Sequence, residues 1–347
     1  MKRLARSFTP CVLVLVCAAG AVGAADAPTP PKLPDQPFTG EFVGTFTPDK
    51  GEPMTGVAKV NYDPRIKPSG GYRATVYAVV SGLIDKAVVG EKTVCPLKIS
   101  LSGTAVGDKA ELEGRNWKAV VTGETFTAKS KAGTFALKRH ERKSPTLLAK
   151  PPHRAVVLLP YEKGKAPSLD AWTNKKWKVA NDGSMTVVPN SGNNLTAGQF
   201  KNFRLHAEFA VSDKAGGNSG FYLLDRYEVQ VLNTFGRGPL KHGCAAIYQT
   251  FAPSADASLP VGQWQTYDIT FHAPVMEGKE VKKRPRITVV HNGVTVHDDI
   301  EIPHATGNAR PRGDTSKGPI VLQDHKSPAR YRNIWLVELD GGEEKTN

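Results

Sequence analysis

Cysteine, long apolar runs and helical periodicity are all scarce in this sequence, and each shortage narrows the class of protein. Four cysteines among 347 residues are too few for a small domain held together by disulfides. Beyond residue 25, no stretch approaches the roughly 18 apolar residues that cross a bilayer. We therefore expect no integral membrane span in the processed chain. No extended stretch repeats apolar residues every 3.6 positions, which favours strands.

Several short enzyme motifs are also absent. The chain has no G-x-S-x-G nucleophile elbow, no H-E-x-x-H zinc motif, no Walker loop and no dinucleotide fingerprint. His206, His242, His291, His297 and His304 show no spacing typical of metal ligands. Any chemistry must therefore come from residues that the fold brings together.

The charge is strongly positive, with 46 Lys and Arg against 33 Asp and Glu, a formal +13. A basic surface can attract nucleic acid. However, no recognisable nucleic-acid motif accompanies the charge, and the chain begins with an export signal. We interpret the excess as a solvated basic surface and expect no nucleic-acid partner.

Residues 1–25 predict a cleaved signal peptide. A positive start over residues 1–6 precedes an apolar run at 11–19, and small residues at 22–24 form a cleavage site. A retained anchor, or a lipoprotein signal ending at Cys17, is the alternative, although bulky Val16 precedes that cysteine where lipid attachment needs a small residue. We expect cleavage near Ala24 and a periplasmic or secreted bacterial protein.

Proline-rich segments divide the rest of the chain. The sequence predicts a linker at 26–37, a small β-rich domain at 38–142, a second linker at 143–154, a larger β domain at 155–340 and a tail at 341–347. Cys95 and Cys244 fall in different predicted domains, so the sequence does not decide whether they are free. Nothing in residues 38–142 indicates a role for the smaller domain.

Alternating polar and apolar residues predict antiparallel strands in both domains. Glycines punctuate the smaller domain at intervals typical of a small antiparallel sheet or barrel. In the larger domain, Leu205 and Ala207 alternate with polar neighbours, and Asn292-Gly293 predicts a tight hairpin turn. The predicted fold is therefore all-β, with a two-sheet jelly-roll sandwich preceded by a smaller antiparallel β domain.

Two polar clusters in the larger domain could carry chemistry. Arg226, Glu228 and Gln230 alternate along one strand, so a guanidinium, a carboxylate and an amide would form a row able to bind a polyol. An exposed cross-strand ladder is the alternative. The second cluster contains His325, whose ordinary pKa of about 6.5 allows proton transfer near neutral pH. Only the fold can bring Glu228 and His325 together.

Nine segments in the larger domain carry a family resemblance. They are FRLHAEF at 203–209, GNSG at 217–220, RYEVQ at 226–230, AIY at 246–248, LP at 259–260, QWQTYDITF at 263–271, HNGV at 291–294, GPIVLQDH at 318–325 and YRNIW at 331–335. In order and spacing they resemble the exported bacterial 3-keto-disaccharide hydrolases over about residues 155–339. These proteins are also described as 3-keto-glucoside 1,2-lyase/3-keto-2-hydroxy-glucal hydratases and were formerly a domain of unknown function. The upstream β-rich segment resembles that of the longer, planctomycete-like members.

The resemblance implies a concanavalin A-like jelly roll with a sugar site on its concave sheet and an oxidised, 3-keto saccharide as substrate. Two departures flank that site. The loop at 212–216 is shorter than the glycine- and arginine-rich loop of many relatives, and Lys326 follows His325 where relatives often have glycine. Which keto-sugar is cleaved therefore stays open.

The implied chemistry needs three groups. A ketone at C3 acidifies the C2 proton, a base removes it, and the C1 substituent leaves by β-elimination; water can then add back. This requires a base, a group for the enolate oxygen and an acid for the leaving oxygen, and it does not require a pair of carboxylates at glycosidase spacing.

The resemblance and the polar clusters together give candidate roles. His325 or Glu228 is the base, and Arg226 or Arg332 stabilises the oxyanion. Alternatively, a divalent cation held by Glu228 and His325 is the electrophile. The side chains predicted to contact the sugar are Asn218, Tyr222, Gln230, Tyr248, Gln323 and Arg332.

A non-catalytic carbohydrate-binding module of the same fold is the alternative function, because this jelly roll serves lectins and enzymes alike. Such a module would depend on aromatic platforms such as Tyr222, Tyr248 or Trp264 rather than on His325 or Glu228.

Overall fold

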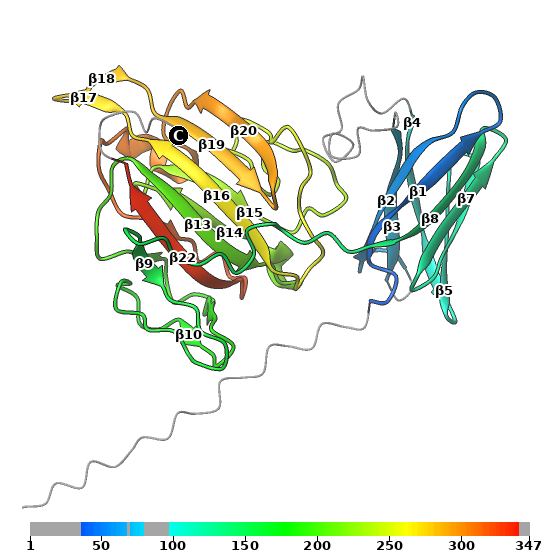
Figure 1. Cartoon of the computed structure of the whole chain (residues 1–347), viewed down its shortest axis with the longest axis horizontal. Coiled ribbons are helices and arrows are strands. Elements are labelled where there is room, and N and C mark those ends of the chain that lie inside the picture. Colours follow the sequence, from blue (N-terminus) through cyan, green and yellow to red (C-terminus); the bar gives the residue numbers. More distant parts are fainter. Residues whose placement is uncertain (1–35, 68–69, 80–96, 340–347) are drawn as a thin grey trace, which may run out of the picture. The chain divides into compact units, whose positions relative to one another are not determined.

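The computed structural model describes residues 36–67, 70–79 and 97–339, and these form strands with two short 3₁₀ helices, η1 (Lys214–Gly217) and η2 (Gly307–Arg312). The all-β prediction is thus confirmed (Figure 1). The predicted signal peptide, most of the first linker, Cys95 and the tail lie outside the described residues. Cys244 is buried and free. None of the described helices is long and apolar enough to span a membrane.

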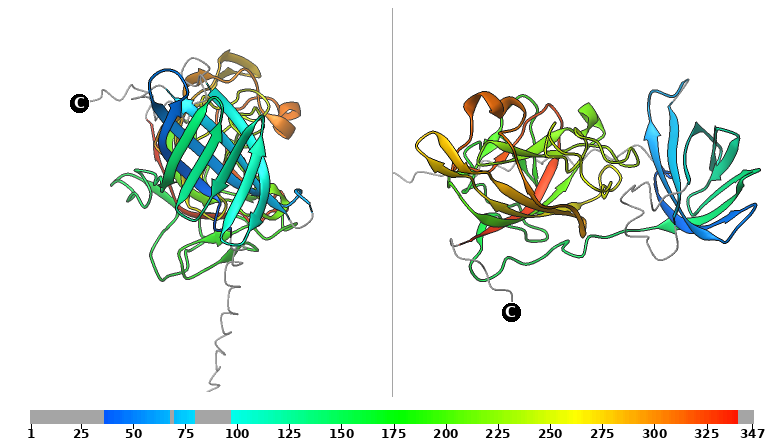
Figure 2. Two further views of the ribbon diagram at one scale, coloured as in Figure 1. Left: turned by 90° about the vertical axis from the view of Figure 1, so that its right-hand side faces the viewer. Right: turned by 90° about the horizontal axis from the view of Figure 1, so that it is seen from above.

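The first eight strands form a closed antiparallel barrel, in which β1 also pairs with β8 (Figures 1 and 2). They are β1 (Gly40–Pro48), β2 (Met54–Asp63), β3 (Gly71–Val79), β4 (Leu97–Val106), β5 (Lys109–Gly114), β6 (Trp117–Val121), β7 (Thr125–Ser130) and β8 (Gly133–His140). Strand β6 shows how alternation in the sequence gives the barrel an inner and an outer face. Trp117, Ala119 and Val121 are buried, while the residues between them are exposed. Phe42, Phe126 and other apolar side chains fill the interior as a packed core.

A second β region follows, with one large and one small sheet. The large sheet contains β9 (Val156–Leu159), β10 (Lys178–Val179), β11 (Met185–Thr186), β13 (Phe203–Ala210), β16 (Gln265–His272), β19 (Arg286–His291), β20 (Val294–Glu301) and β22 (Arg330–Glu338). The small sheet contains β12 (Asn194–Leu195), β14 (Ser219–Leu223), β15 (Tyr227–Val231) and β21 (Val321–Leu322). A separate hairpin joins β17 (Val275–Glu277) to β18 (Glu280–Lys283).

The two sheets share one apolar core, which is consistent with a jelly-roll-like arrangement. Phe221 of the small sheet packs edge-on against Tyr331 of the large sheet, with ring centroids 5.4 Å apart. The Tyr331 hydroxyl also lies 2.5 Å from Ser219 Oγ. The predicted turn at Asn292-Gly293 joins β19 to β20, and both residues have positive φ, as that turn requires.

Part of the second predicted linker is bound to the large sheet. Residues 144–149, here called the strap, contact the sheet face that points away from the core. Thr146 Oγ1 donates to Asp268 at 2.6 Å, and the backbone N–H of Leu148 donates to Glu208 at 2.5 Å. Asn333 Nδ2 in turn donates to the carbonyl of Ala149 at 2.9 Å. The prolines stop regular structure here, as predicted, but the strap is held in place by buried polar partners.

Candidate functional site

The strand register places the predicted sugar-binding side chains together on one face of the small sheet. Tyr222 of β14 lies directly opposite Glu228 of β15, and Gly220 lies opposite Gln230. Gln323 follows β21 and donates its backbone N–H to the carbonyl of Gly220 at 3.0 Å. Because alternate residues of a strand point the same way, these five residues share a face, here called the polar face. The residues between them fill the core.

Two glycines make room for the Glu228 carboxylate. A Cβ at Gly220 would lie 2.5 Å from Glu228 Oε1, so the carboxylate rests against bare backbone. A Cβ at Gly307 would lie 3.6 Å from Glu228 Oε2 and 3.1 Å from the ring of Tyr248. The neighbouring Thr306 accepts the Glu228 backbone N–H at 2.8 Å. Residues 306–307 and Tyr248 thus form a wall beside the polar face.

Four oxygen atoms at this place are buried without a hydrogen-bond partner: Asn218 Oδ1, Glu228 Oε2, Gln230 Oε1 and Gln323 Oε1. Asn218 lies directly before β14, between that strand and η1. All four atoms are acceptors, and buried acceptors are normally paired. A ligand that offers several hydroxyl groups would satisfy them, so the site fits a neutral polyol.

The Glu228 carboxyl is poised to exchange a proton near neutral pH. Its residue is only 1% exposed, and burial raises its pKa to about 7. A hydrogen bond from the Tyr222 hydroxyl acts in the opposite direction but does not offset the burial. Burial and the Glu228 charge also raise the pKa of Tyr222, which stays a neutral donor. A carboxyl with such a pKa suits a general base or acid.

The structure therefore brings six predicted residues together. These are Asn218, Tyr222, Glu228, Gln230, Tyr248 and Gln323. Sequence reasoning missed Gly220, Thr306 and Gly307. Gly220 stands in the quoted GNSG segment, where a glycine opposite a polar residue could have indicated space for a ligand. No local signal marks Thr306 and Gly307, because they reach the site from a distant loop.

Arg226 lies at the end of the predicted row rather than in it. Strand β15 begins at Tyr227, after a turn in which Leu224 and Asp225 have positive φ. The guanidinium is half-buried and pairs with Asp225 at 3.4 Å, while its Nε is buried without a partner. The prediction of a continuous strand row from 226 to 230 is thus corrected at its first residue.

Arg332 lies on the other sheet, at its outer face. Its Nε donates to Glu208 Oε2 at 2.7 Å. The guanidinium also stacks on Trp264 at 4.1 Å and on Tyr161 at 4.8 Å from the ring centroids. The expectation that Arg332 contacts the sugar or its oxyanion beside Glu228 is therefore corrected, because the strand places this side chain on the opposite surface. Trp264 is likewise covered by a guanidinium.

His325 is exposed, two residues beyond Gln323, and no hydrogen bond or ion pair of its side chain occurs among the described residues. In the described part of the chain, no three His, Cys, Asp or Glu side chains gather as a metal-binding group. A cation shared by Glu228 and His325 stays a prediction.

A second buried charged cluster lies beneath the strap. His206 Nδ1 is 2.7 Å from Asp268, and Glu208 accepts hydrogen bonds from Arg332, Asn333 and the strap. Although burial alone would raise it, the His206 imidazole at 3.7 Å and hydrogen bonds from Asn333 and Arg332 lower the pKa of Glu208. A groove of about 340 Å³ borders this cluster. Its carboxylates are already paired, so we interpret the cluster as the anchor of the strap.

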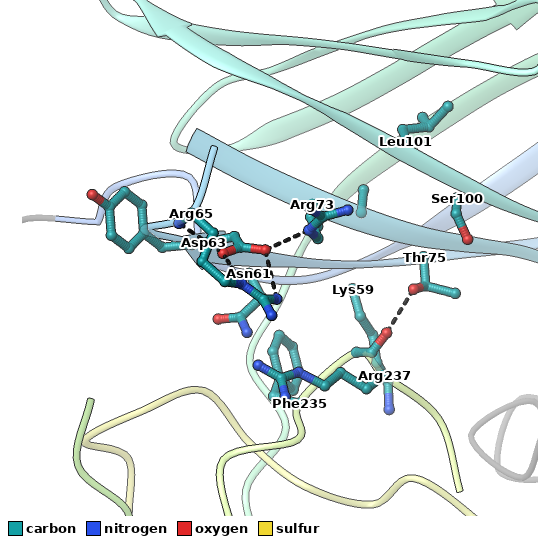
Figure 3. Close-up of a pocket in the computed structure, with 13 residues that line it drawn as sticks. Lys59, Asn61, Asp63, Arg65, Arg73, Thr75, Ser100, Leu101, Phe235 and Arg237 are labelled. Carbon is teal, nitrogen blue, oxygen red and sulfur yellow. Dashed lines mark hydrogen bonds and ion pairs between the residues drawn. The ribbon is translucent and has the colours of Figure 1, made fainter. Parts of the chain in front are cut away.

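The barrel carries a basic pocket of about 170 Å³ beside β2 and β3 (Figure 3). Asp63 lies at its edge and binds the guanidinium groups of Arg65, at 2.9 Å, and Arg73. These hydrogen bonds, Arg65 first, lower the pKa of Asp63 strongly. The carboxylate of this pocket is thus already paired with guanidinium groups, unlike the bare acceptors of the polar face.

Several solved structures are similar to about half of the chain. A "putative glycosyl hydrolase" from Parabacteroides distasonis ATCC 8503 is 32% identical, with a TM-score of 0.49, and the match covers 54% of this chain and 84% of that one. Another so described from the same organism is 21% identical, with a TM-score of 0.39 and coverage of 54% and 100%. The carbohydrate-binding module CBM66 from Bacillus subtilis is 14% identical, with a TM-score of 0.25 and coverage of 50% and 98%.

No curated protein matches the chain. A family model described as the 3-keto-alpha-glucoside-1,2-lyase-like domain matches residues 159–337, which is just over half of the sequence. That range contains the polar face and nearly all of the two sheets around it. The chain therefore belongs to the family of 3-keto-alpha-glucoside-1,2-lyase-like domains, a family of carbohydrate-active enzymes.

Proposed function

We propose that this protein cleaves 3-keto-glycosides or 3-keto-disaccharides by β-elimination at C1, with Glu228 as the base. The observation that carries the proposal is the buried Glu228 carboxyl, whose Oε2 has no partner and whose pKa is about 7. Three unpaired amide oxygens beside it suit the hydroxyl groups of a neutral sugar. The second β region would then be the concanavalin A-like jelly roll implied by the family.

The reaction divides into two balanced steps. Glu228 Oε2 removes the C2 proton, and the electron pair of that C–H bond moves into the enolate of the C3 ketone. The enolate then expels the C1 substituent with its bonding electrons, which leaves a C1–C2 double bond, and the departing oxygen takes up a proton. Addition of water to the double bond completes net hydrolysis.

Arg226 is the proposed cation for the developing oxyanion. It is the residue two before Glu228, and its buried Nε has no hydrogen-bond partner. Preorganised donors aimed at a developing charge commonly contribute the largest single share of catalysis. His325, being exposed at the end of the Gln323 segment, is proposed to contact the substrate rather than to remove the proton.

The test compares the 3-keto and the ordinary form of one glucoside. The chain without residues 1–24 is incubated with each, with and without a chelator, and release of the C1 substituent and enone absorbance are followed. Release from the keto form alone supports elimination. A loss of release when the chelator is present would indicate that a metal ion takes part. Release from the ordinary form, or from neither, contradicts the proposal. Retained sugar binding without turnover would favour a binding module.

Export is part of the same proposal. Residues 1–25 carry the pattern of a signal peptide cleaved near Ala24, and oxidised saccharides outside the cytoplasm would then be the accessible substrates. The mass of the N-terminal peptide of protein taken from cells tests this. A chain that still begins at Met1 in the periplasmic fraction would contradict cleavage.

A further inference from the structure

The polar face supplies one carboxyl, whereas elimination needs both a proton acceptor and a proton donor. Among the described residues of this face and its wall, the remaining side chains with an ionisable proton are Tyr222 and Tyr248. The Tyr248 ring packs against Gly307. Tyr222 interacts directly with the carboxyl.

Tyr222 occupies a defined place in a hydrogen-bond chain. Gln323 Nε2 donates to the Tyr222 hydroxyl oxygen at 3.1 Å. The hydroxyl also interacts with the Glu228 carboxyl, whose residue lies directly opposite on the neighbouring strand. Because the glutamine fills one acceptor position, the phenolic proton is aimed at the carboxyl. The tyrosine is only 7% exposed, so water has little access to this contact.

We propose that Tyr222 is a proton relay that passes the proton taken by Glu228 to the oxygen of the leaving group. This inference rests on the proposed function and deepens it. One carboxyl would thereby act as base in the first step and, through the tyrosine, as acid in the second.

The proton count closes over the cycle. The C2–H bond breaks, and the proton binds Glu228. As the C1–O bond breaks, the Tyr222 O–H proton moves to the leaving oxygen and the Glu228 proton moves to the phenolic oxygen. The products are the neutral alcohol and the unsaturated keto-sugar, and both side chains return to their starting states. The tyrosine is never left as a phenolate, which its buried surroundings would strongly disfavour.

Leaving groups with different proton demands separate a relay from a positioning role. An alcohol leaving group must be protonated, whereas 4-nitrophenolate is stable without a proton. We compare Tyr222→Phe with the unmodified chain on two 3-keto-glucosides that differ only in this group. The relay predicts a loss of about 10²–10³-fold in kcat for the alkyl glucoside and a loss of less than about threefold for the nitrophenyl glucoside. Equal losses on both substrates would overturn the relay.

Tyr248→Phe is the matched control, because it removes the hydroxyl of the other tyrosine at this site. It is expected to lower turnover by the same factor on both substrates. Thermal unfolding and sugar binding of each variant show whether the fold is kept, and a folded Tyr222→Phe variant with wild-type kcat on the alkyl glucoside also overturns the relay. If the unmodified chain releases neither group, the proposed function itself fails; activity with equal Tyr222→Phe losses removes the relay alone.

Discussion

Two buried glutamates in the same β region differ in almost every respect. Glu208 is 0% exposed and Glu228 is 1% exposed. Glu208 receives hydrogen bonds from a guanidinium, an amide and the strap, and its pKa is lowered. Glu228 lies opposite Tyr222, keeps Oε2 without a hydrogen-bond partner and has its pKa raised by burial to about 7. Burial is equal, so the partners decide the outcome.

The comparison shows how to separate a structural carboxylate from a reactive one. A buried charge is tolerated when surrounding donors replace the lost water. Around Glu208 they do, and the residue ties the strap to the sheet. Around Glu228 the donors are missing on one side, which is the arrangement expected where a ligand supplies them.

The largest expected effect is on turnover. Glu228→Gln keeps the size of the side chain but removes the base, so we expect kcat on a 3-keto-glucoside to fall by about 10²–10⁴-fold. Steady-state kinetics measure the loss, and binding of the sugar should persist. Glu208→Gln, assayed per folded molecule, should keep its turnover. Similar losses in both variants would remove the distinction between the two glutamates.

The free energy of unfolding should depend on Glu208, although turnover should not. Glu208→Gln leaves the Arg332 guanidinium largely buried without its counter-charge, which should cost about 3–5 kcal/mol of unfolding free energy. Urea unfolding measures the change. Arg332→Leu should also destabilise while turnover per folded molecule is kept. Wild-type stability in Glu208→Gln, or lost turnover in folded Arg332→Leu, would show that the outer-face cluster has another role.

The pH dependence of stability sharpens the contrast. Because burial raises the pKa of Glu228 from 4.5 to about 7, the folded state holds its proton more tightly. This contribution is fully present below about pH 4.5 and is lost as the pH rises through about 7. Its size is about 3 kcal/mol. Glu228→Gln should therefore be more stable than wild type at pH 8. For Glu208 the sign reverses, and its contribution is lost at acidic pH.

Thermal unfolding of wild type and Glu228→Gln at several pH values measures this difference. The groups that act on the Glu228 region are Tyr222, Tyr248, Asp225 and Tyr331. Neither Tyr222 nor Tyr331 ionises near pH 7, because burial raises the pKa of both. A stability difference that does not change between pH 5 and pH 8 would contradict the assignment.

A smaller effect should follow from closing the space under the carboxylate. Gly220→Ala places a methyl group 2.5 Å from Glu228 Oε1, so the carboxylate must move. Overpacking of this kind costs about 1–3 kcal/mol, and we expect turnover to fall about tenfold. Gly123→Ala is the control, because a Cβ there meets no atom within 4 Å. Equal activity of the two variants would show that Gly220 is not needed for space.

Much of the fold follows from local patterns in the sequence. Alternation in segments such as 117–121 and 227–231 predicts strands whose apolar side chains share one face, and the structure places those apolar side chains in the two cores. Closure of the barrel does not follow, because pairing of β1 with β8 joins residues about 100 positions apart. Short-range periodicity contains no information about such pairing.

The candidate site likewise has one part that the sequence predicts and another part that it does not. Glu228 and Gln230 could be placed on one face from strand periodicity. The opposition of Tyr222 to Glu228 depends on the register of β14 against β15, and the side of Arg332 depends on which sheet receives β22. Periodicity says that Arg332 faces away from the core, but not which outer surface it joins. The strap was missed because prolines mark the end of regular structure without showing what the chain then contacts.

The strap also affects how susceptible the chain is to proteolysis. A proline-rich connection of this composition would ordinarily be the first place to be nicked. Here the Leu148 amide and the Ala149 carbonyl are bound to side chains of the sheet, so the backbone cannot adopt the extended form that a protease cleft requires unless those bonds break. Cleavage after Lys143 should therefore be slow in the native protein, and it should accelerate at acidic pH, where Glu208 takes up a proton and releases the chain.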